Sequence, residues 1–292
     1  MANTITLKRR IGSVKNTRQI TKAMELVAAS KMRRAQDAAH EGRVYRQAAH
    51  SLLTRLSMLT EVDEHPLFTK RPVKTRLYVI ITSDRGLAGA YNANITRLHV
   101  RSMQADKAAS IKSQVIAIGK QGAQFARRIE NAELIAAYPA FSDHPTANDV
   151  RPVLNTVTEL YTTKQVDDVQ LLYTQFQSNI VQTAMQLSLL PAKFEPTDEA
   201  ESEETLQNVT FEPNIQAVLD NVTERLLEVQ LWQALLESVA SEHSMRMMAM
   251  KNATDNANDL VDDLTLEFNT ARQAAITQEL AEITGGAEAI SA

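Results

Sequence analysis

Two glycine-containing turns hold the residues best suited to chemistry, because each follows a short apolar run that reads as a strand. Residues 83–89 (SDRGLAG) follow residues 77–82 (LYVIIT), and residues 119–122 (GKQG) follow a second such run. A glycine-rich turn between a strand and a helix is where doubly wound domains bind phosphate. Neither turn, however, has the spacing GxGxxG or GxxxxGK[ST]. We therefore favour a tight turn that presents Asp84 and Arg85 to a partner, and keep nucleotide binding as the alternative.

The usual catalytic and metal-binding residues do not group along the chain. Cysteine is absent, which excludes disulfides, thiolate metal sites and cysteine nucleophiles. No serine stands in the context of a nucleophile elbow. The histidines are scattered, at His40, His50, His65, His99, His144 and His243. We predict no catalytic residue, no metal site and no bound cofactor.

Charge is distributed unevenly between the two ends of the chain, although the whole chain carries a net charge of only −4. Residues 1–59 contain twelve Lys and Arg against three acids, whereas residues 206–292 contain four against fourteen. The basic end lacks the aromatic residues that stack on nucleic-acid bases, since Tyr45 is its first. A membrane-binding helix would carry Trp, Phe or Leu opposite its charges, whereas Ala and Met dominate here. An acidic protein partner fits this end best, and no nucleic acid is expected.

The two ends of the chain are predicted to form two long helices. No Gly or Pro interrupts the chain between Pro213 and Gly285, and a 3–4 repeat from Ile215 to Ala271 is polar at only three of its seventeen positions. Such a repeat predicts a left-handed supercoil with another helix. At about 1.5 Å per residue this helix would be on the order of 110 Å long. His243 lies on the repeat and is interpreted as a polar position that sets the register of the helices.

The N-terminal segment is the expected antiparallel partner of that helix. It is predicted to be helical from about Ile5 to Leu59 and carries an apolar stripe that begins Met24, Ala28, Met32 and Ala35. Small residues in this stripe allow two helix axes to approach closely. Because the C-terminal helix is longer, one of its ends should continue alone.

The middle of the chain changes to an α/β pattern. Apolar β-branched runs predict strands at 77–82, 115–118 and 169–173, with a further edge strand at 181–189, and helices are expected near 92–104, 121–130 and 148–164. This alternation predicts a small Rossmann-like sheet. An acidic stretch then reads as a solvated linker. The predicted division is residues 1–60 (helix), 61–195 (α/β domain), 196–208 (acidic linker) and 209–292 (helix).

Three motifs resemble those of one family, the gamma subunits of F-type ATP synthases. They are residues 20–32 (ITKAMELVAASKM), residues 83–89 (SDRGLAG), and the pair 245–257 and 271–283 near the C-terminus. They occur in the family's order and span the whole chain. The resemblance implies a bacterial-type rotor subunit with no active site of its own. Two departures are Ala88, where the family often has cysteine, and the absence of a basic residue just before Ala271.

The resemblance also implies roles for individual residues. Contacts to the lever and catch loops of the catalytic β subunits fall on Lys22, Met24, Lys31, Arg33, Arg34, Asp84, Arg85, Arg246, Arg272, Gln273 and Glu282. A foot toward the epsilon subunit and the c-ring of the membrane sector falls on Phe211, Glu212 and Pro213. The implied partners are therefore the α3β3 head, epsilon and the c-ring.

The implied function is the coupling of proton flow to conformational cycling of the β subunits, in synthesis or in reverse. No apolar run of signal-peptide or membrane-spanning length is evident, so we expect membrane attachment only through partners, on the cytoplasmic side of a bacterial membrane. Two alternatives stay open: a nucleotide-dependent enzyme built on the α/β domain, and a coiled-coil scaffold or nucleic-acid tether without a rotary role.

Overall fold

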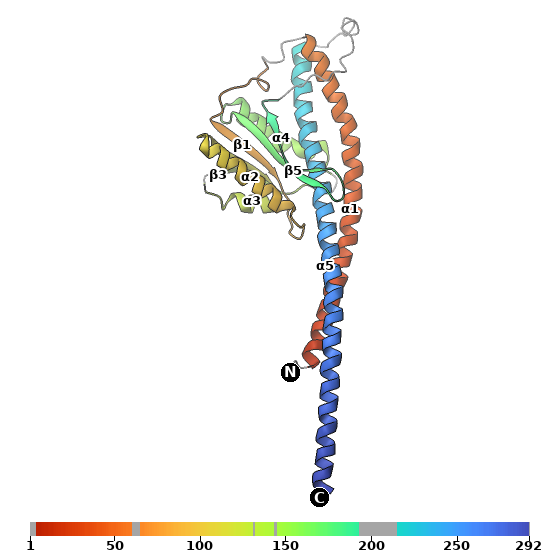
Figure 1. Cartoon of the computed structure of the whole chain (residues 1–292). Coiled ribbons are helices and arrows are strands. Elements are labelled where there is room, and N and C mark those ends of the chain that lie inside the picture. The colour runs from red at the N-terminus through yellow and green to blue at the C-terminus, as the bar shows by residue number, and fades with distance from the viewer. Residues whose placement is uncertain (1–3, 60–64, 131, 143–144, 193–214, 292) are drawn as a thin grey trace. The chain divides into compact units, whose positions relative to one another are not determined.

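The computed structural model describes residues 4–59, 65–130, 132–142, 145–192 and 215–291 (Figure 1). The chain divides into two compact units. The paired-helix unit comprises residues 1–28 and 246–292, and the sheet unit comprises residues 29–245. The two longest helices, α1 (Thr4–Leu59) and α5 (Ile215–Ser291), contribute a segment to each unit.

The sheet unit is built on five strands in the order β3-β2-β1-β4-β5. The strands are β1 (Thr75–Ile81), β2 (Lys112–Ile118), β3 (Ala132–Tyr138), β4 (Asp168–Phe176) and β5 (Gln182–Leu190). Neighbouring strands from β3 to β4 pair in parallel, and β5 pairs antiparallel to β4. The central strands are apolar on both sides because helices cover both faces of the sheet.

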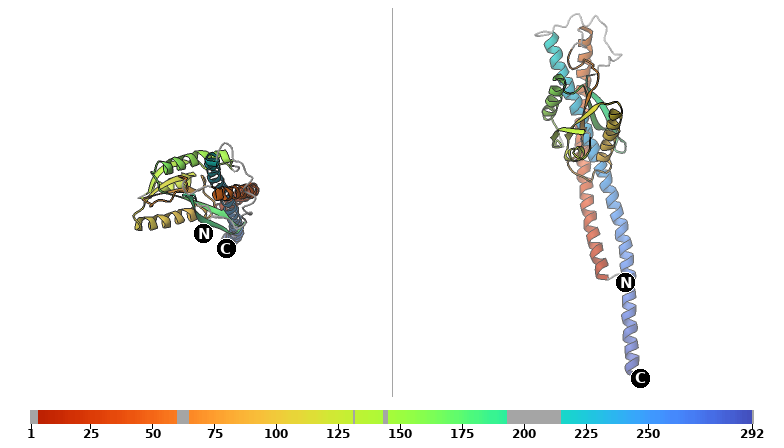
Figure 2. Two further views of the ribbon diagram at one scale, coloured as in Figure 1. Left: turned by 90° about the horizontal axis from the view of Figure 1, so that it is seen from above. Right: turned by 90° about the vertical axis from the view of Figure 1, so that its left-hand side faces the viewer.

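Two helical layers enclose this sheet, made by α2 (Tyr91–Ala108) and α3 (Lys120–Ala126) on one face and by α4 (Ala147–Thr162) and the first part of α5 on the other. Ile80 belongs to the same buried cluster as Ile95 of α2. Its neighbour Val79 faces the opposite cluster, with Val157 of α4 and Leu231 of α5. Figure 2 shows α2 and α4 on opposite sides of the sheet.

Polar contacts fix the first part of α5 to the sheet unit as well. The backbone N–H of Thr174 in β4 donates to Ser238 Oγ at 3.2 Å, and Ser241 Oγ donates to the Thr174 carbonyl at 3.2 Å. The Trp232 indole donates to the Pro145 carbonyl at 2.8 Å. Residues 215–245 therefore complete the core of the sheet unit, as these bonds and the shared apolar cluster show.

In the paired-helix unit the two helix segments run antiparallel. Thr254 Oγ1 donates to Thr21 Oγ1 at 2.8 Å, and Arg18 Nη1 donates to Asn258 Oδ1 at 3.1 Å. Residue numbers therefore rise along α5 in the direction in which they fall along α1. The buried positions of α5 follow the predicted 3–4 repeat, namely Met250, Thr254, Ala257, Val261 and Leu264. Figure 1 shows α5 continuing past the first turn of α1. The sequence-based expectations of the buried face and of the unequal lengths are confirmed.

The expected strands and helices of the middle region are confirmed with one omission, because β3 was not predicted. Alanine occupies three of its seven positions, at Ala132, Ala136 and Ala137. Alanine is depleted in strands. The strand is also half-exposed at the edge of the sheet, so it lacks the continuous apolar run that marks β1 and β2.

Candidate functional site

The turn after β1 is held in place by the side chain of Asp84. Its Oδ1 accepts hydrogen bonds from the backbone N–H groups of Lys120, at 2.9 Å, and of Ala140, at 3.0 Å. One carboxylate thus ties together the segments that follow β1, β2 and β3. Asp84 is half-buried, whereas Arg85 is exposed. Of the two residues predicted to face a partner from this turn, the geometry leaves Arg85 the freer to do so.

A second set of bonds makes the same turn rigid. Ser83 donates its backbone N–H to Asn92 Oδ1 at 3.1 Å and its hydroxyl to the Arg85 carbonyl at 2.7 Å. Leu87 adopts a left-handed backbone, with φ of 62°, and its side chain is 65% exposed. This exposed apolar side chain is a candidate contact residue that was not predicted from the sequence. Its signal was a leucine between two glycines in a turn.

The glycines after β2 serve packing and leave little room for a phosphate. Gly119 has φ of +95°, and a Cβ there would lie 2.2 Å from the Thr82 carbonyl oxygen. The first four N–H groups of α3 already donate to protein acceptors, which are Asp84 Oδ1, the Ser83 carbonyl, Thr82 Oγ1 and the Gly119 carbonyl. An anion would have to displace these bonds, so the geometry disfavours the nucleotide-binding alternative.

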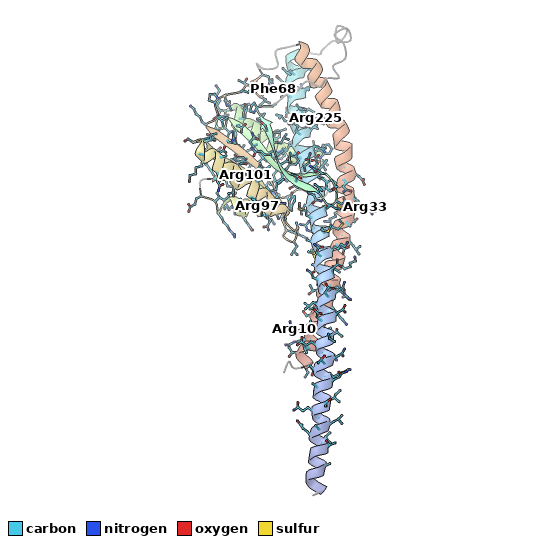
Figure 3. All side chains as sticks on the ribbon, viewed as in Figure 1. Arg10, Arg33, Phe68, Arg97, Arg101 and Arg225 are labelled. Carbon is cyan, nitrogen blue, oxygen red and sulfur yellow. The ribbon has the colours of Figure 1, made fainter. Side chains whose placement is uncertain are left out.

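The basic residues predicted on α1 differ in exposure. Lys22 is exposed and pairs with Glu25 at 3.0 Å, while Arg33 and Arg34 are exposed on the next turns. Figure 3 shows Arg33 on this helix. Met24 and Lys31 are half-buried. The same stretch exposes three apolar side chains that the prediction did not include, namely Ile20, Leu26 and Val27.

The predicted residues of α5 lie mostly in a segment that no described residue covers. Arg272, Gln273 and Glu282 are exposed, and Glu282 accepts a hydrogen bond from Gln278 Nε2 at 3.0 Å. Arg246 is half-buried. From residue 272 to residue 287 every residue except Ala275 is exposed.

Three large apolar side chains lie in this exposed segment of α5. Ile276, Leu280 and Ile283 are 49%, 58% and 68% exposed. Their spacing of four and three residues places them on one face of the helix. The segment therefore carries an apolar stripe that no described residue buries.

The predicted foot, Phe211, Glu212 and Pro213, lies outside the described residues, as does the acidic linker. In the described ranges no helix is long and apolar enough to cross a membrane. The remaining candidate residues divide between the units: Lys22, Met24 and the α5 residues belong to the paired-helix unit, and the others to the sheet unit.

Comparison with known proteins decides between the open alternatives. Residues 3–290 match the family model described as ATP synthase. The ATP synthase gamma chain of Acidithiobacillus ferrooxidans is 41% identical over 290 residues, which covers 99% of this chain and 100% of that protein. The chain belongs to the ATP synthase gamma chain family. The gamma chain is a non-catalytic stalk subunit of ATP synthase.

Solved structures agree with this assignment. A chain in the central stalk and c-ring structure of the Tetrahymena thermophila mitochondrial ATP synthase is 26% identical, with a TM-score of 0.61, over 80% of this chain and 99% of that chain. A chain of the Euglena gracilis mitochondrial ATP synthase matches with a TM-score of 0.67 at 19% identity, over 98% of this chain and 94% of that chain. The second likeness concerns the fold alone. The family predicted from the three motifs is confirmed.

Proposed function

We propose that this chain is the central-stalk rotor of a bacterial F-type ATP synthase. It would couple proton flow through the membrane sector to conformational cycling of the catalytic β subunits, in the direction of synthesis or of hydrolysis-driven pumping. The observation that carries the proposal is the uncovered end of α5, where Ile276, Leu280 and Ile283 expose an apolar stripe. Membership in the gamma chain family supplies the partner that would surround it.

The proposed coupling follows from a mismatch of symmetry. A single asymmetric subunit inside a ring of three identical β subunits cannot contact all three in the same way. Each β subunit is then biased toward a different conformation, and rotation of the central subunit exchanges the three states. A contact that has equal free energy in every state would shift none of them. The rotor must therefore present different side chains to the three β subunits.

The contact residues predicted from the motifs are proposed to make these unequal contacts. Arg272 and Gln273, both exposed, would meet catch loops of the β subunits. The basic residues of α1 and the turn that exposes Arg85 would meet their acidic lever segments. Glu282 and Arg246 would contribute to coupling. The foot at residues 211–213 would contact epsilon and the c-ring.

The finer features of the fold are part of the same proposal. The antiparallel helix pair would be a left-handed coiled coil that resists torsion, and the sheet unit would be a Rossmann-like domain that binds no nucleotide. Residues 196–208 would form a linker between the sheet domain and the C-terminal helix. The subunit would be peripheral to the membrane, on its cytoplasmic side, and attached through epsilon and the c-ring.

Direct observation of rotation tests the proposal. This chain is assembled with α and β subunits of a bacterial relative, and a bead is fixed to an added cysteine in the sheet unit. We expect ATP-driven rotation of the bead in one direction. The double substitution Arg272→Ala/Gln273→Ala should reduce the torque, whereas Lys251→Ala, an exposed position on the same helix, should not.

Two outcomes would contradict the rotor. One is ATP hydrolysis by the assembled complex while the bead stays still. The other is failure of the chain to join the ring, together with micromolar binding of ATP or NAD by the isolated chain in equilibrium dialysis, which would favour the enzyme alternative.

A further inference from the structure

The sheet unit has a groove along α2. One hollow of about 760 Å³ and another of about 440 Å³ share Val100 and Gln104, so they adjoin along α2 and together form the groove. Along α2 it extends from Ala93 to Lys107. At 1.5 Å per residue, this is a length of about 21 Å, or roughly four helical turns.

The floor of this groove is largely apolar. From α2 it contains Val100 and Met103, which are both half-buried. The facing wall contributes Phe125 and Ile129, from α3 and the segment after it. The opposite face of α2, which includes Ile95, is buried against the sheet. This flank of α2 thus keeps apolar atoms accessible, with α2 on one side and α3, the segment after it and the first residues of β2 and β3 on the other.

The rim of the groove is basic. Arg97, Arg101 and Lys107 of α2 are exposed along it, and Figure 3 shows the two arginines on this helix. Arg97 and Arg101 are four residues apart and therefore project from the same face. Among the described side chains no carboxylate forms an ion pair with any of the three.

The acidic residues of the opposite wall compensate this charge only in part. Glu133 is already engaged, with Lys112 Nζ at 2.8 Å and Gln114 Nε2 at 3.1 Å. The hydrogen bond from Lys112 is the main cause that lowers the pKa of Glu133. Glu130 is the remaining acid of the wall. Three basic groups thus face one unpaired carboxylate.

We propose that this groove binds an acidic amphipathic helix of a partner protein. The longest side of the groove is the helix α2, and an incoming helix laid along it would contact Val100 and Met103 with apolar side chains at helical spacing. Carboxylates one turn apart on that helix would meet Arg97 and Arg101. The free charges of the rim select an acidic partner over a basic one.

A charge-swap binding assay with the full chain tests this assignment. The probes are two fluorescent 15-residue helical peptides with leucines at i, i+3, i+4 and i+7, one carrying glutamates and the other lysines on its remaining face. The groove variant is Arg97→Glu/Arg101→Glu. The matched control is Lys8→Glu/Arg9→Glu, at exposed positions of α1, which changes the net charge by the same amount.

We expect the glutamate peptide to bind the unmodified chain and the control alike. The groove variant should bind the glutamate peptide with a roughly tenfold higher dissociation constant. It should bind the lysine peptide better than the unmodified chain does. Met103→Glu should weaken the glutamate peptide further. Circular dichroism checks that each variant is folded.

Three results would overturn the proposal. The glutamate peptide could fail to saturate the chain, or its affinity could fall equally in the groove variant and the control, which would indicate unspecific attraction to basic surface. Saturation by decanoate with no response to either peptide would instead assign the groove to a small amphiphile.

Discussion

The two units of this chain handle their buried and exposed groups in different ways. In the sheet unit, large apolar side chains such as Ile80 and Leu231 are completely buried, and charged groups in the interior meet partners of the same unit. In the paired-helix unit, the buried seam holds small and polar residues such as Ala257 and Thr254 beside larger ones such as Leu264, while Ile276 and Leu280 stay exposed. The sheet unit thus has a large apolar core of its own, whereas the end of α5 exposes apolar side chains that no described residue buries.

The interior of the sheet unit also holds a buried ionic network. Asp106, which is 1% exposed, pairs with Arg76 and accepts hydrogen bonds from Tyr78 Oη at 2.5 Å and Ser113 Oγ at 3.3 Å. Arg76 Nε also donates to Asp168 Oδ2 at 2.5 Å. Burial is the largest of the effects that raise the pKa of Tyr78. This network joins α2 to the first residues of β1 and β4.

Removing the centre of this network should have the largest effect on stability. Asp106→Ala leaves Arg76 with one partner fewer and the buried Tyr78 hydroxyl without an acceptor. Breaking a buried ion pair in this way costs about 3–5 kcal/mol. Urea unfolding should show a loss of that order. Hydrogen exchange should place it in the sheet unit and leave the protection of residues 246–264 unchanged.

The control for that prediction is an exposed ion pair of the same sheet. Glu133→Gln removes the contact with Lys112, whose side chain is 62% exposed. Because solvent screens such pairs, the free energy of unfolding should not change measurably. An equal loss in both variants would contradict the view that burial makes the Asp106 network important.

The next effect concerns His99, which makes the sheet unit sensitive to acid. Its ring is fully buried near Tyr78 and Phe125, and neither ring nitrogen has a hydrogen-bond partner among the described residues. Burial lowers the pKa of His99 from 6.5 to about 4. The unfolded chain therefore takes up this proton near pH 6.5, while the folded chain resists it down to about pH 4.

The sign of the pH effect follows from this difference. The stabilising contribution is complete above pH 6.5, is lost progressively as the pH falls toward 4, and then levels off. At pH 5 the loss should be about 2 kcal/mol, out of a full difference of about 3 kcal/mol. The variant His99→Phe removes the titrating group, so its unfolding free energy should fall less between pH 7 and pH 5. Identical pH profiles for both proteins would show that His99 is not the origin of the acid sensitivity.

Periodicity along the chain predicted the helical parts of the fold well. The 3–4 repeat on α5 identified positions such as Val261 and Leu264 that are buried, because a helix long enough to show several repeats averages out single exceptions. Short β-branched runs likewise predicted β1 and β2. Strand β3 was not predicted because its small side chains, such as Ala136, contribute little apolar signal at the edge of a sheet.

The roles of individual site residues were harder to predict. The motif marked Asp84 as a partner contact, but only the folded chain shows that its carboxylate accepts two backbone hydrogen bonds from segments distant in sequence. The exposed Leu87 depends on the direction of a turn, which composition does not reveal. The groove beside Arg97 and Arg101 arises where α2 packs beside α3, so no local sequence pattern predicts it.

The smallest effect on stability should accompany the largest effect on assembly. Ile276→Asp/Leu280→Asp changes two side chains that the chain itself leaves exposed, so its unfolding free energy should stay within about 0.5 kcal/mol of the unmodified value. Incorporation into a complex with α and β subunits, followed by gel filtration, should nevertheless be impaired, because two charges would enter an apolar contact. The control Asn252→Asp/Asn256→Asp adds the same charge at exposed positions of α5 and should assemble normally. Normal assembly and rotation of the Ile276→Asp/Leu280→Asp variant would mean that the apolar stripe is not buried by a partner, and the contrast between the two units would lose its functional meaning.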